Sequence, residues 1–349
     1  MGKKKIIHYF TILNNKIFNI IYFLKRKIVK DKVNNDQSLL DLIDTENSKR
    51  LLDFKNKDTF IIKYKIEYCF GFPHFVHTME YFYSLSEIII KNQYNIVFAI
   101  QPDKHFTSNY VNEYFKNLLS FYNNFIFTTE EFISNYTPDK NYFYHCQMRK
   151  QVKFLYKNKL FYGNIKEWFK DKTIANELIK KFFPNENLNN NNKNKIKIGL
   201  VNRLKNRKLI NNEEICKKIR QEFGIIVDIS YFENKSFREQ ISFFNNHDII
   251  ISPHGAQLCS IPFLPKDGLI IECCSDEWHP YDYFSGLSMT SSKIHVMICN
   301  DHSEFPKYRS HKYKGRQKKL NIKIDSNIII KAIKYFLEDK LNNEQIYLM

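Results

Sequence analysis

One stretch of the chain, residues 248–258, combines an apolar run with residue types that can hold a phosphate group. It reads Asp-Ile-Ile-Ile-Ser-Pro-His-Gly-Ala-Gln-Leu, which predicts a buried strand, a glycine-containing turn and the start of a helix. The first N–H groups of a helix have no partners within it, and the helix dipole favours an anion there. Gly255 would let the backbone approach a phosphate closely, and His254 could donate a further hydrogen bond. A glycine that serves only the turn is the alternative.

Two other segments place charged side chains near the same edge of the predicted sheet. Glu272 follows the apolar run 269–271, where its carboxylate could accept hydrogen bonds from ribose hydroxyls. Arg203 and Arg207 follow another apolar run, and guanidinium groups bind phosphate oxygens in a bidentate manner. Because ligands of open parallel sheets lie beyond the carboxyl ends of the strands, we expect these side chains to share one site. A capping or salt-bridging Glu272 and two surface arginines are the alternatives.

Motifs that other phosphate-handling enzymes require are absent from the sequence. No two aspartates stand two residues apart, so there is no Asp-x-Asp pair to hold a divalent ion against a diphosphate. The Walker A sequence, the Gly-x-Gly-x-x-Gly fingerprint and the Gly-x-Ser-x-Gly nucleophile elbow are also missing. These absences argue against P-loop NTPases, kinases, common dehydrogenases and α/β-hydrolases. We expect neither a metal nor another cofactor.

The elements that must position these residues alternate between strands and helices, which indicates parallel α/β units. In the second half of the chain, strands are predicted over 196–201, 225–230, 248–252, 269–273 and 293–298. In the first half, they are predicted over 60–64, 95–100, 124–128 and 142–148. Helices are predicted over 74–92, 109–121, 165–183, 212–223, 237–245, 281–289 and 322–337, with a short one from Ala256.

An asparagine-rich run over residues 185–195 is the clearest linker, and it divides the chain into two Rossmann-like α/β domains. The remaining boundaries follow from composition. They give a basic segment 1–27, a polar linker 28–55, an N-terminal domain 56–184, a C-terminal domain 196–320, and a closing helix with its tail 321–349.

The formal net charge of +17 is compatible with nucleic acid, an anionic membrane surface or a phosphorylated small molecule. The lysines are scattered, however, and accompany abundant Asn, Ile, Phe and Tyr, a combination that AT-rich coding also produces. We therefore expect no nucleic-acid binding. The seven cysteines contain no Cys-x-x-Cys pair, so we expect buried free thiols rather than a disulfide framework.

Residues 6–24 form an apolar-rich stretch between two basic clusters. Lys16 interrupts it, and a central lysine costs roughly 2.5–3.5 kcal/mol on membrane-insertion scales. The spacing favours a basic amphipathic helix on a membrane surface or on the protein itself, with a signal-anchor as the alternative. An ER/Golgi-type membrane and a cytoplasmic membrane surface are both compatible with it, so the compartment stays open.

Several of these segments resemble glycosyltransferase family 61, which includes EGF-domain-specific O-GlcNAc transferases and plant xylosyl- and arabinosyltransferases. The resemblance is carried by residues 236–241 (Ser-Phe-Arg-Glu-Gln-Ile), 248–258 and 262–265 (Pro-Phe-Leu-Pro). Residues 203–214 match an Arg-x-x-x-Arg-x-Ile/Leu-x-Asn-x-x-Glu pattern, and 72–76 (Phe-Pro-His-Phe-Val) is similar to the family's entry into a helix.

Two positions depart from the family's pattern. Gln257 replaces a second glycine, which would narrow the phosphate pocket, and residues 266–268 lengthen the following Pro-Gly turn.

The resemblance implies a GT-B architecture, in which two Rossmann-like domains face each other across a cleft. The nucleotide-sugar would lie on the C-terminal domain and the acceptor mainly on the N-terminal one. The implied reaction is an inverting, metal-independent transfer from a UDP-sugar, carrying GlcNAc, xylose or a similar sugar, to a hydroxyl group of a protein or glycan. A catalytically degenerate member that binds a glycan or polyanion is the alternative.

Each step of such a transfer needs its own residues. Glu272 is expected to bind the ribose. The leaving diphosphate would be stabilised by Arg203, Arg207 and the corner formed by Pro253, His254, Gly255, Ala256 and Gln257. One general base must accept the acceptor's proton, and the candidates are His74, His77, Glu80 and Asp103.

Overall fold

The computed structural model describes residues 59–64, 95–100, 125–129, 149–156, 159–184, 196–233, 235–275, 280–300 and 320–349. It also describes residues 79, 83, 86–87, 89–91, 117 and 121–122. The chain divides into two units, Met1–Asn56 and Lys57–Met349, and every described residue belongs to the second. The predicted 6–24 helix and the predicted linkers 28–55 and 185–195 lie outside the described residues. Within the described part, no helix is both long and apolar enough to cross a membrane.

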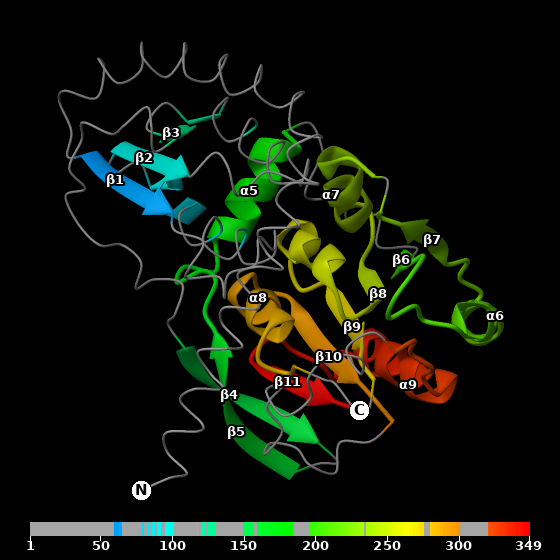
Figure 1. Cartoon of the computed structure of the whole chain (residues 1–349). Coiled ribbons are helices and arrows are strands. Elements are labelled where there is room, and N and C mark those ends of the chain that lie inside the picture. Colours follow the sequence, from blue (N-terminus) through cyan, green and yellow to red (C-terminus); the bar gives the residue numbers. More distant parts are fainter. Residues whose placement is uncertain are drawn as a thin grey trace, which may run out of the picture. The chain divides into compact units, whose positions relative to one another are not determined.

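The five strands predicted for the second half of the chain are present and run parallel. They are β6 (Ile198–Asn202), β7 (Asp228–Tyr231), β8 (Ile249–Pro253), β9 (Leu269–Cys273) and β10 (Ile294–Ile298). Their order in the sheet is β7-β6-β8-β9-β10, as seen in part in Figure 1. The chain therefore moves from β6 to one side, returns to the other side at β8, and continues in that direction. This is the order of a doubly wound sheet.

The two faces of this sheet are covered by different helices, because neighbouring residues of a strand point to opposite faces. On one face, Ile250 and Ile270 pack with α7 (Phe237–Asn245), the 3-10 helix η6 (Ala256–Phe263) and α8 (Phe284–Thr290). On the other, Ile251 and Ile271 pack with α6 (Asn212–Phe223) and α9 (Ser326–Leu337). All four isoleucines are fully buried.

The sheet extends beyond β10 by three strands that the sequence analysis did not predict. These are β11 (Gln345–Leu348), β4 (Arg149–Tyr156) and β5 (Lys159–Lys166). β11 lies between β10 and β4 and is parallel to both, while β4 and β5 form an antiparallel hairpin. The result is one sheet of eight mostly parallel strands. Segments on both sides of the predicted 185–195 linker thus contribute to the same sheet.

The helix expected over 165–183 is correct only in its second half. Residues up to Lys166 belong to β5, and α5 (Ile174–Phe182) begins eight residues later. A separate parallel sheet contains β1 (Thr59–Tyr64), β2 (Asn95–Ile100) and β3 (Phe125–Thr129) in that order. These three strands confirm the predictions over 60–64, 95–100 and 124–128. The strand predicted over 142–148 lies outside the described residues.

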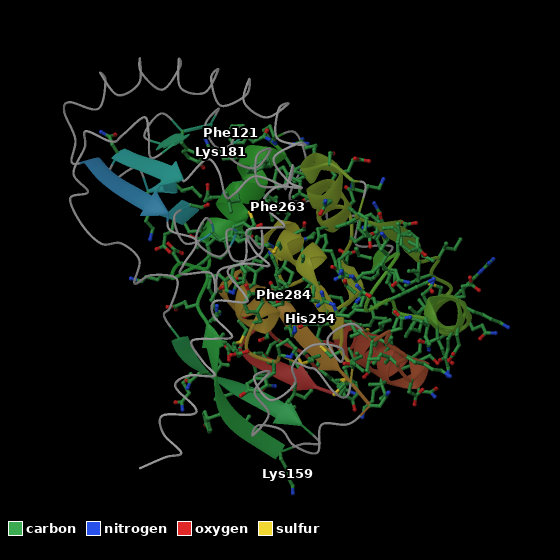
Figure 2. All side chains as sticks on the ribbon, viewed as in Figure 1. Phe121, Lys159, Lys181, His254, Phe263 and Phe284 are labelled. Carbon is green, nitrogen blue, oxygen red and sulfur yellow. The ribbon has the colours of Figure 1, made fainter. Side chains whose placement is uncertain are left out.

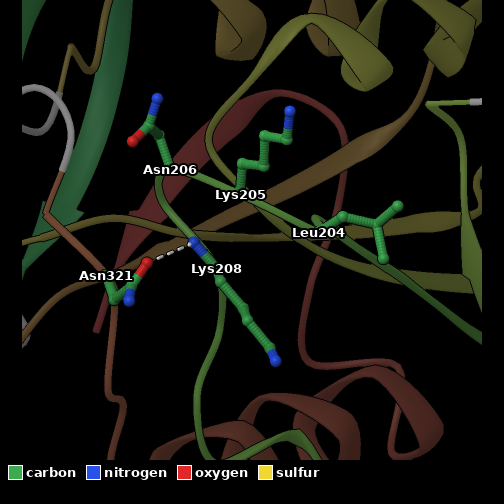
Figure 3. A pocket seen from close by; sticks show the side chains of 5 residues that line it. All are labelled: Leu204, Lys205, Asn206, Lys208 and Asn321. Atoms are coloured by element: carbon green, nitrogen blue, oxygen red, sulfur yellow. Dashed lines mark hydrogen bonds between the residues drawn. The ribbon is translucent and has the colours of Figure 1, made fainter.

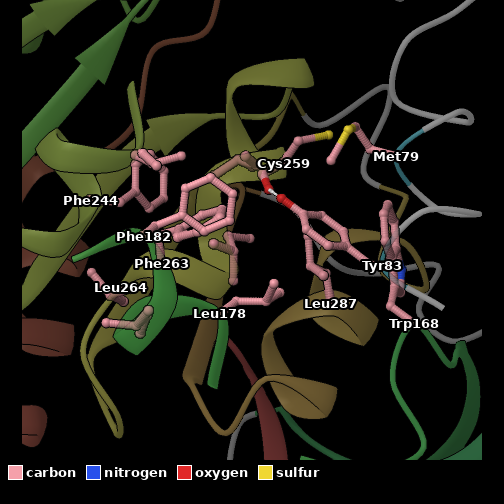
Figure 4. Close-up of a cluster of buried hydrophobic side chains, with 14 of the residues drawn as sticks. Met79, Tyr83, Trp168, Leu178, Phe182, Phe244, Cys259, Phe263, Leu264 and Leu287 are labelled. Carbon is pink, nitrogen blue, oxygen red and sulfur yellow. Dashed lines mark hydrogen bonds between the residues drawn. The ribbon is translucent and has the colours of Figure 1, made fainter. Parts of the chain in front are cut away.

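An aromatic cluster in the first core anchors η6, the element that follows β8 (Figure 4). Phe263 of η6 contacts Phe182 of α5 and Phe237 of α7 edge-on, at ring-centroid distances of 5.3 and 5.9 Å. The Tyr83 hydroxyl donates to the carbonyl oxygen of Cys259 over 2.6 Å. This packing fixes the position of η6 and of the corner that precedes it.

Candidate functional site

The carboxyl ends of β6 and β8 meet at the point where the order of the sheet reverses. In doubly wound sheets, this crevice is where ligands bind. β6 leads into Arg203, and β8 leads into His254 and Gly255. Arg203 Nη1 lies so close to Gly255 that a Cβ atom on residue 255 would overlap it. The structure therefore brings together two segments that the sequence analysis placed at one edge.

A glycine is required at position 255 because the Arg203 side chain lies so close, whereas the backbone angles there do not require one. Its φ of 171° and ψ of 177° are extended values that any residue adopts. The side chain of Gln257 also lies against Gly255, and a Cβ atom there would overlap its Oε1. Gln257 donates from Nε2 to Ser252 Oγ over 3.1 Å and to the Pro253 carbonyl over 2.7 Å. The glutamine in place of a glycine thus folds back onto the end of β8.

Arg203 and Arg207 form a pair of partly buried positive charges beside this corner. Arg203 Nε and Nη1 are buried and have no hydrogen-bond partner within the described part of the chain. Burial lowers the pKa of Arg203. Burial and the neighbouring charge of Arg203 lower the pKa of Arg207 to about 10, so both guanidinium groups are charged at neutral pH. Two adjacent cations with buried N–H donors form an environment suited to an anion.

The loop that carries both arginines is held in a strained conformation. Arg207 has a φ of 63°, in the left-handed region that non-glycine residues rarely occupy. Such conformations persist where the surrounding structure imposes them, and they concentrate at functional sites.

Asn202, the last residue of β6, closes the base of this loop. Its Nδ2 donates to the Leu209 carbonyl over 3.0 Å, and its Oδ1 accepts from the Leu209 N–H over 2.9 Å. The same Oδ1 accepts from the Arg203 N–H over 2.9 Å. Asn202 is buried, and the sequence analysis assigned it no role. Its position between an apolar strand and the first arginine is the signal that could have identified it.

The second half of the family pattern in residues 203–214 also has a structural role. Asn211 Nδ2 donates to the Ile324 carbonyl over 2.8 Å, and Glu214 Oε1 accepts from Ser326 Oγ over 2.7 Å. These bonds tie the start of α6 to the segment that leads into α9. Similarly, Ser236 and Glu239 form a capping box at the start of α7. Both motifs position elements.

Glu272, at the end of β9, has partners different from the ribose that was expected. The residue is fully buried, and its two carboxylate oxygens bond to imidazoles on either side. Oε1 bonds to His254 Nδ1, and Oε2 lies 3.0 Å from His295 Nε2. Burial alone would raise the pKa of Glu272, but the two histidines lower it to about 2. Glu272 is thus an ionised carboxylate shared by two rings.

His254 lies within this network on the side of the arginines. Its ring packs beside Phe284 of α8, with ring centroids 5.2 Å apart (Figure 2). Burial lowers its pKa, and so do the charges of Arg207 and Arg203, whereas Glu272 raises it. The net shift is downward and favours the neutral ring.

His295 and Ser288 extend the network away from the corner. His295 lies on β10 and is fully buried, and its Nδ1 is 2.9 Å from Ser288 Oγ on α8. Neither residue was predicted to have a role, because a single histidine within an apolar strand is typical of a core position.

His254, Glu272 and Cys274 have potential ligand atoms within 4.8 Å of one another, the one such group in the described ranges. The histidine and the carboxylate already bond to each other. Burial raises the pKa of the Cys274 thiol well above its usual value, which keeps the thiol protonated. This arrangement favours internal hydrogen bonding over metal ligation.

An open pocket of about 410 Å³ lies on the outer side of the arginine loop (Figure 3). It is lined by Leu204, Lys205, Asn206, Lys208 and Asn321. The Lys208 N–H donates to Asn321 Oδ1 over 3.1 Å, so one wall of the pocket also fixes the loop. The four base candidates, His74, His77, Glu80 and Asp103, lie outside the described residues.

The chain is similar in sequence to known glycosyltransferases. The family model described as Glycosyltransferase 61 matches residues 72–271. Over 75 residues, the chain is 33% identical to Protein O-linked-mannose beta-1,4-N-acetylglucosaminyltransferase 2 of Xenopus tropicalis. It is 30% identical to the proteins of the same name from Mus musculus and Homo sapiens over the same length. Each match covers 22% of this chain and 13% of the relative.

Proposed function

Because the chain belongs to glycosyltransferase family 61, we propose that it transfers a sugar from a UDP-sugar to a hydroxyl group of a protein or glycan acceptor. The acceptor oxygen would form a bond to the anomeric carbon from the side opposite the diphosphate. The bond between that carbon and the diphosphate oxygen would break, and UDP would leave. In-line attack of this kind inverts the configuration at the anomeric carbon.

The observation that carries this proposal is the arginine pair at the corner after β8. A leaving diphosphate gains negative charge as the glycosidic bond breaks, and donors placed beforehand stabilise that charge most effectively. Arg203 supplies two buried N–H groups that have no partner within the described residues. Arg207 adds a second charge, and Gly255 leaves room for close approach. With two guanidinium groups and no Asp-x-Asp motif, we propose that the transfer requires no metal ion.

Glu272 is assigned a different role from the expected ribose contact. Both of its carboxylate oxygens are already bonded to histidines, and the residue is fully buried. We propose that it orients His254 beside the diphosphate.

The acceptor side of the reaction is proposed from the family resemblance. In a GT-B arrangement, the part of residues 56–184 that lies outside the eight-stranded sheet would bind the acceptor opposite the corner described above. The general base would be one of His74, His77, Glu80 and Asp103.

UDP binding tests the proposed function directly. Wild-type protein should be stabilised against thermal unfolding by UDP and by its UDP-sugar donor, equally with and without a chelator.

Arg207→Ala should keep the fold but lose transfer, since removing one such donor typically costs about 2.7–4 kcal/mol of transition-state stabilisation. Arg220→Ala, which removes an exposed arginine of α6, is the matched control.

Three results would contradict parts of this proposal. Full turnover by Arg207→Ala would remove the arginine pair from the mechanism, and turnover that disappears with chelator would disprove metal independence. UDP binding without any hydrolysis or transfer would favour the alternative, a degenerate binding protein. Gln257 in the corner is the feature consistent with that alternative.

A further inference from the structure

A chain of four buried side chains runs from the donor corner into the core between β10 and α8. It consists of His254, Glu272, His295 and Ser288, in that order. Ser288, His295 and Glu272 are fully buried, and His254 is 6% exposed. Only His254 lies against the proposed diphosphate site, so the other three act at a distance from any ligand.

The direction of the hydrogen bonds in this chain follows from the chemistry of its members. An ionised carboxylate only accepts, so His295 Nε2 and His254 Nδ1 must each carry a proton. In a neutral His295 ring, Nδ1 is then an acceptor, and its partner is the Ser288 hydroxyl, which can donate. For the same reason, neutral His254 carries its proton on Nδ1. The ionised carboxylate thus determines the proton positions of both rings, and the Ser288 hydroxyl donor is consistent with the position on His295.

We propose that His295 is a positioning residue of the donor site: together with Ser288, it keeps Glu272 ionised and thereby fixes the ring and the tautomer of His254. The expected effect of His295 on UDP binding rests on the proposed function. The geometry of the network itself does not depend on the identity of the ligand.

Removal of the His295 N–H should change how the site responds to pH. Glu272 would lose one of its two charge-assisted bonds while remaining buried, which raises its pKa. On protonation, the carboxyl group would donate to His254 Nδ1, and His254 would then carry its proton on Nε2 instead. Because a folded-state pKa near 2 is raised, the ionised state would be lost at a higher pH than in the wild-type protein.

Other ionisable groups around the network are few in the described part of the chain. Neither α8 nor β8 contains an ionisable residue. His254 directly follows the last residue of β8. The charged and thiol groups that face Glu272 or His254 are Arg203, Arg207, Cys273 and Cys274, with Cys299 beside Cys274. Burial raises the pKa of Cys273 and of Cys274, so the thiols stay neutral over the range tested below.

The test compares UDP affinity from pH 5 to pH 8 by isothermal titration calorimetry for wild-type, His295→Leu and His295→Gln. Glutamine places an N–H donor near the position of His295 Nε2, whereas leucine offers none. We expect His295→Leu to bind UDP about tenfold more weakly than wild-type at pH 5, the loss that results when about nine-tenths of its Glu272 carboxyl groups are protonated at that pH. At pH 8 the two affinities should agree within about threefold, and His295→Gln should follow the wild-type profile. The titration of UDP itself is common to all three proteins.

A serine pair on the same part of the fold provides a matched control. Ser288→Ala removes the terminal donor, whereas Ser291→Ala removes a buried hydroxyl whose one hydrogen-bond partner among the described residues is the Leu287 carbonyl. Ser288→Ala should weaken UDP binding at low pH in the same direction as His295→Leu. Ser291→Ala should not alter the pH dependence.

Imidazole ¹⁵N chemical shifts provide a readout that needs no ligand. In wild-type protein labelled at histidine, His295 should be protonated at Nε2 and unprotonated at Nδ1, with assignments taken from His295→Gln. The reverse pattern would overturn the proposal, as would a folded His295→Leu protein whose pH profile matches wild-type. Equal losses in His295→Gln and His295→Leu would overturn it too. Failure of wild-type to bind UDP would contradict the proposed function alone, and the ¹⁵N spectrum would still decide the network.

Discussion

At the level of single residues, the corner after β8 depends on the absence of one side chain. Gly255 has extended backbone angles, so its role is to leave space for the Arg203 guanidinium and the Gln257 amide. Gly224 is a useful contrast. It ends α6 with a φ of 66°, and no atom outside its own neighbourhood lies within 4 Å of where a Cβ would be. One glycine is required by packing and the other by conformation.

Gly255→Ala should therefore reduce function without much loss of stability. The new methyl group would displace the far ends of two flexible side chains, Arg203 and Gln257, and so move one donor away from the diphosphate. Since loss of one such donor lowers kcat by about 10²–10³-fold, we expect a reduction toward that range, with the melting temperature nearly unchanged.

Gly224→Ala should give the opposite result. Alanine at a positive φ destabilises a protein by about 1 kcal/mol, and Gly224 has no contact with the donor corner. Urea unfolding and UDP calorimetry of both variants separate the two effects. A Gly255→Ala protein with wild-type UDP affinity would show that the close approach of Arg203 is incidental.

At the level of elements, the arginine loop is useful only because its two ends are fixed. Asn202 bonds reciprocally with Leu209, and Leu209 in turn forms a parallel bridge with Ile322. The bonds of that bridge run from the Ile210 N–H to the Ile322 carbonyl over 2.9 Å and from the Ile322 N–H to the Lys208 carbonyl over 2.8 Å. The left-handed conformation of Arg207 lies between these fixed points.

Asn202→Ala should weaken both the fold and the site. It leaves the buried backbone groups of Leu209 and the part-buried N–H of Arg203 without their Asn202 partner, which costs about 1–3 kcal/mol in the free energy of unfolding. Relaxation of Arg207 from its strained conformation should also lower UDP affinity. Asn206→Ala, an exposed change on the same loop, should alter the free energy of unfolding by less than about 0.5 kcal/mol. Equal effects of the two changes would argue against a role of Asn202 in fixing the arginine loop.

The elements that could be predicted from the sequence are those whose signal is local. The strands β6, β8, β9 and β10 are predominantly apolar runs separated by turn residues, so their positions followed directly, and so did the edge where Arg203, His254 and Glu272 meet. The polar strand β7 begins three residues after its predicted start. The hairpin β4–β5 was missed because it is lysine-rich and its outer strand is largely exposed, which weakens the apolar pattern. β11 is four residues long, and only its pairing with strands far away in the sequence identifies it.

The difference between local and long-range signals also explains why the partners of Glu272 were not predicted. A carboxylate at a strand end is visible in the sequence, but the residue it bonds to is not. His295 is the second residue of β10, and it reaches Glu272 only because the two strands lie in a register that pairs His295 with Ile270. Register between neighbouring parallel strands is a property of the whole sheet, so the assignment of Glu272 to a ribose could not be tested from local pattern.

At the level of the whole molecule, one sheet is assembled from three separated parts of the chain. β11 lies between β10 and β4, so residues 345–348 connect the hairpin 149–166 to the strands that carry the donor corner. Ile346 is fully buried and packs with Val152, Ile165 and Met297. The stability of this end of the sheet therefore depends on a short strand near residue 349.

Ile346→Ala tests that dependence. Loss of a buried isoleucine side chain costs about 2–5 kcal/mol, and the cavity would lie where β11 joins the two parts of the sheet. We expect backbone amides of β4 and β5 to exchange hydrogen faster in this variant than in wild-type, because the hairpin loses the packing that holds it against β11. Amides of β6 and β8, on the far side of β10, should change only as much as global stability does. Uniform acceleration across all eight strands would instead show that the sheet unfolds as one unit, with no separate role for β11.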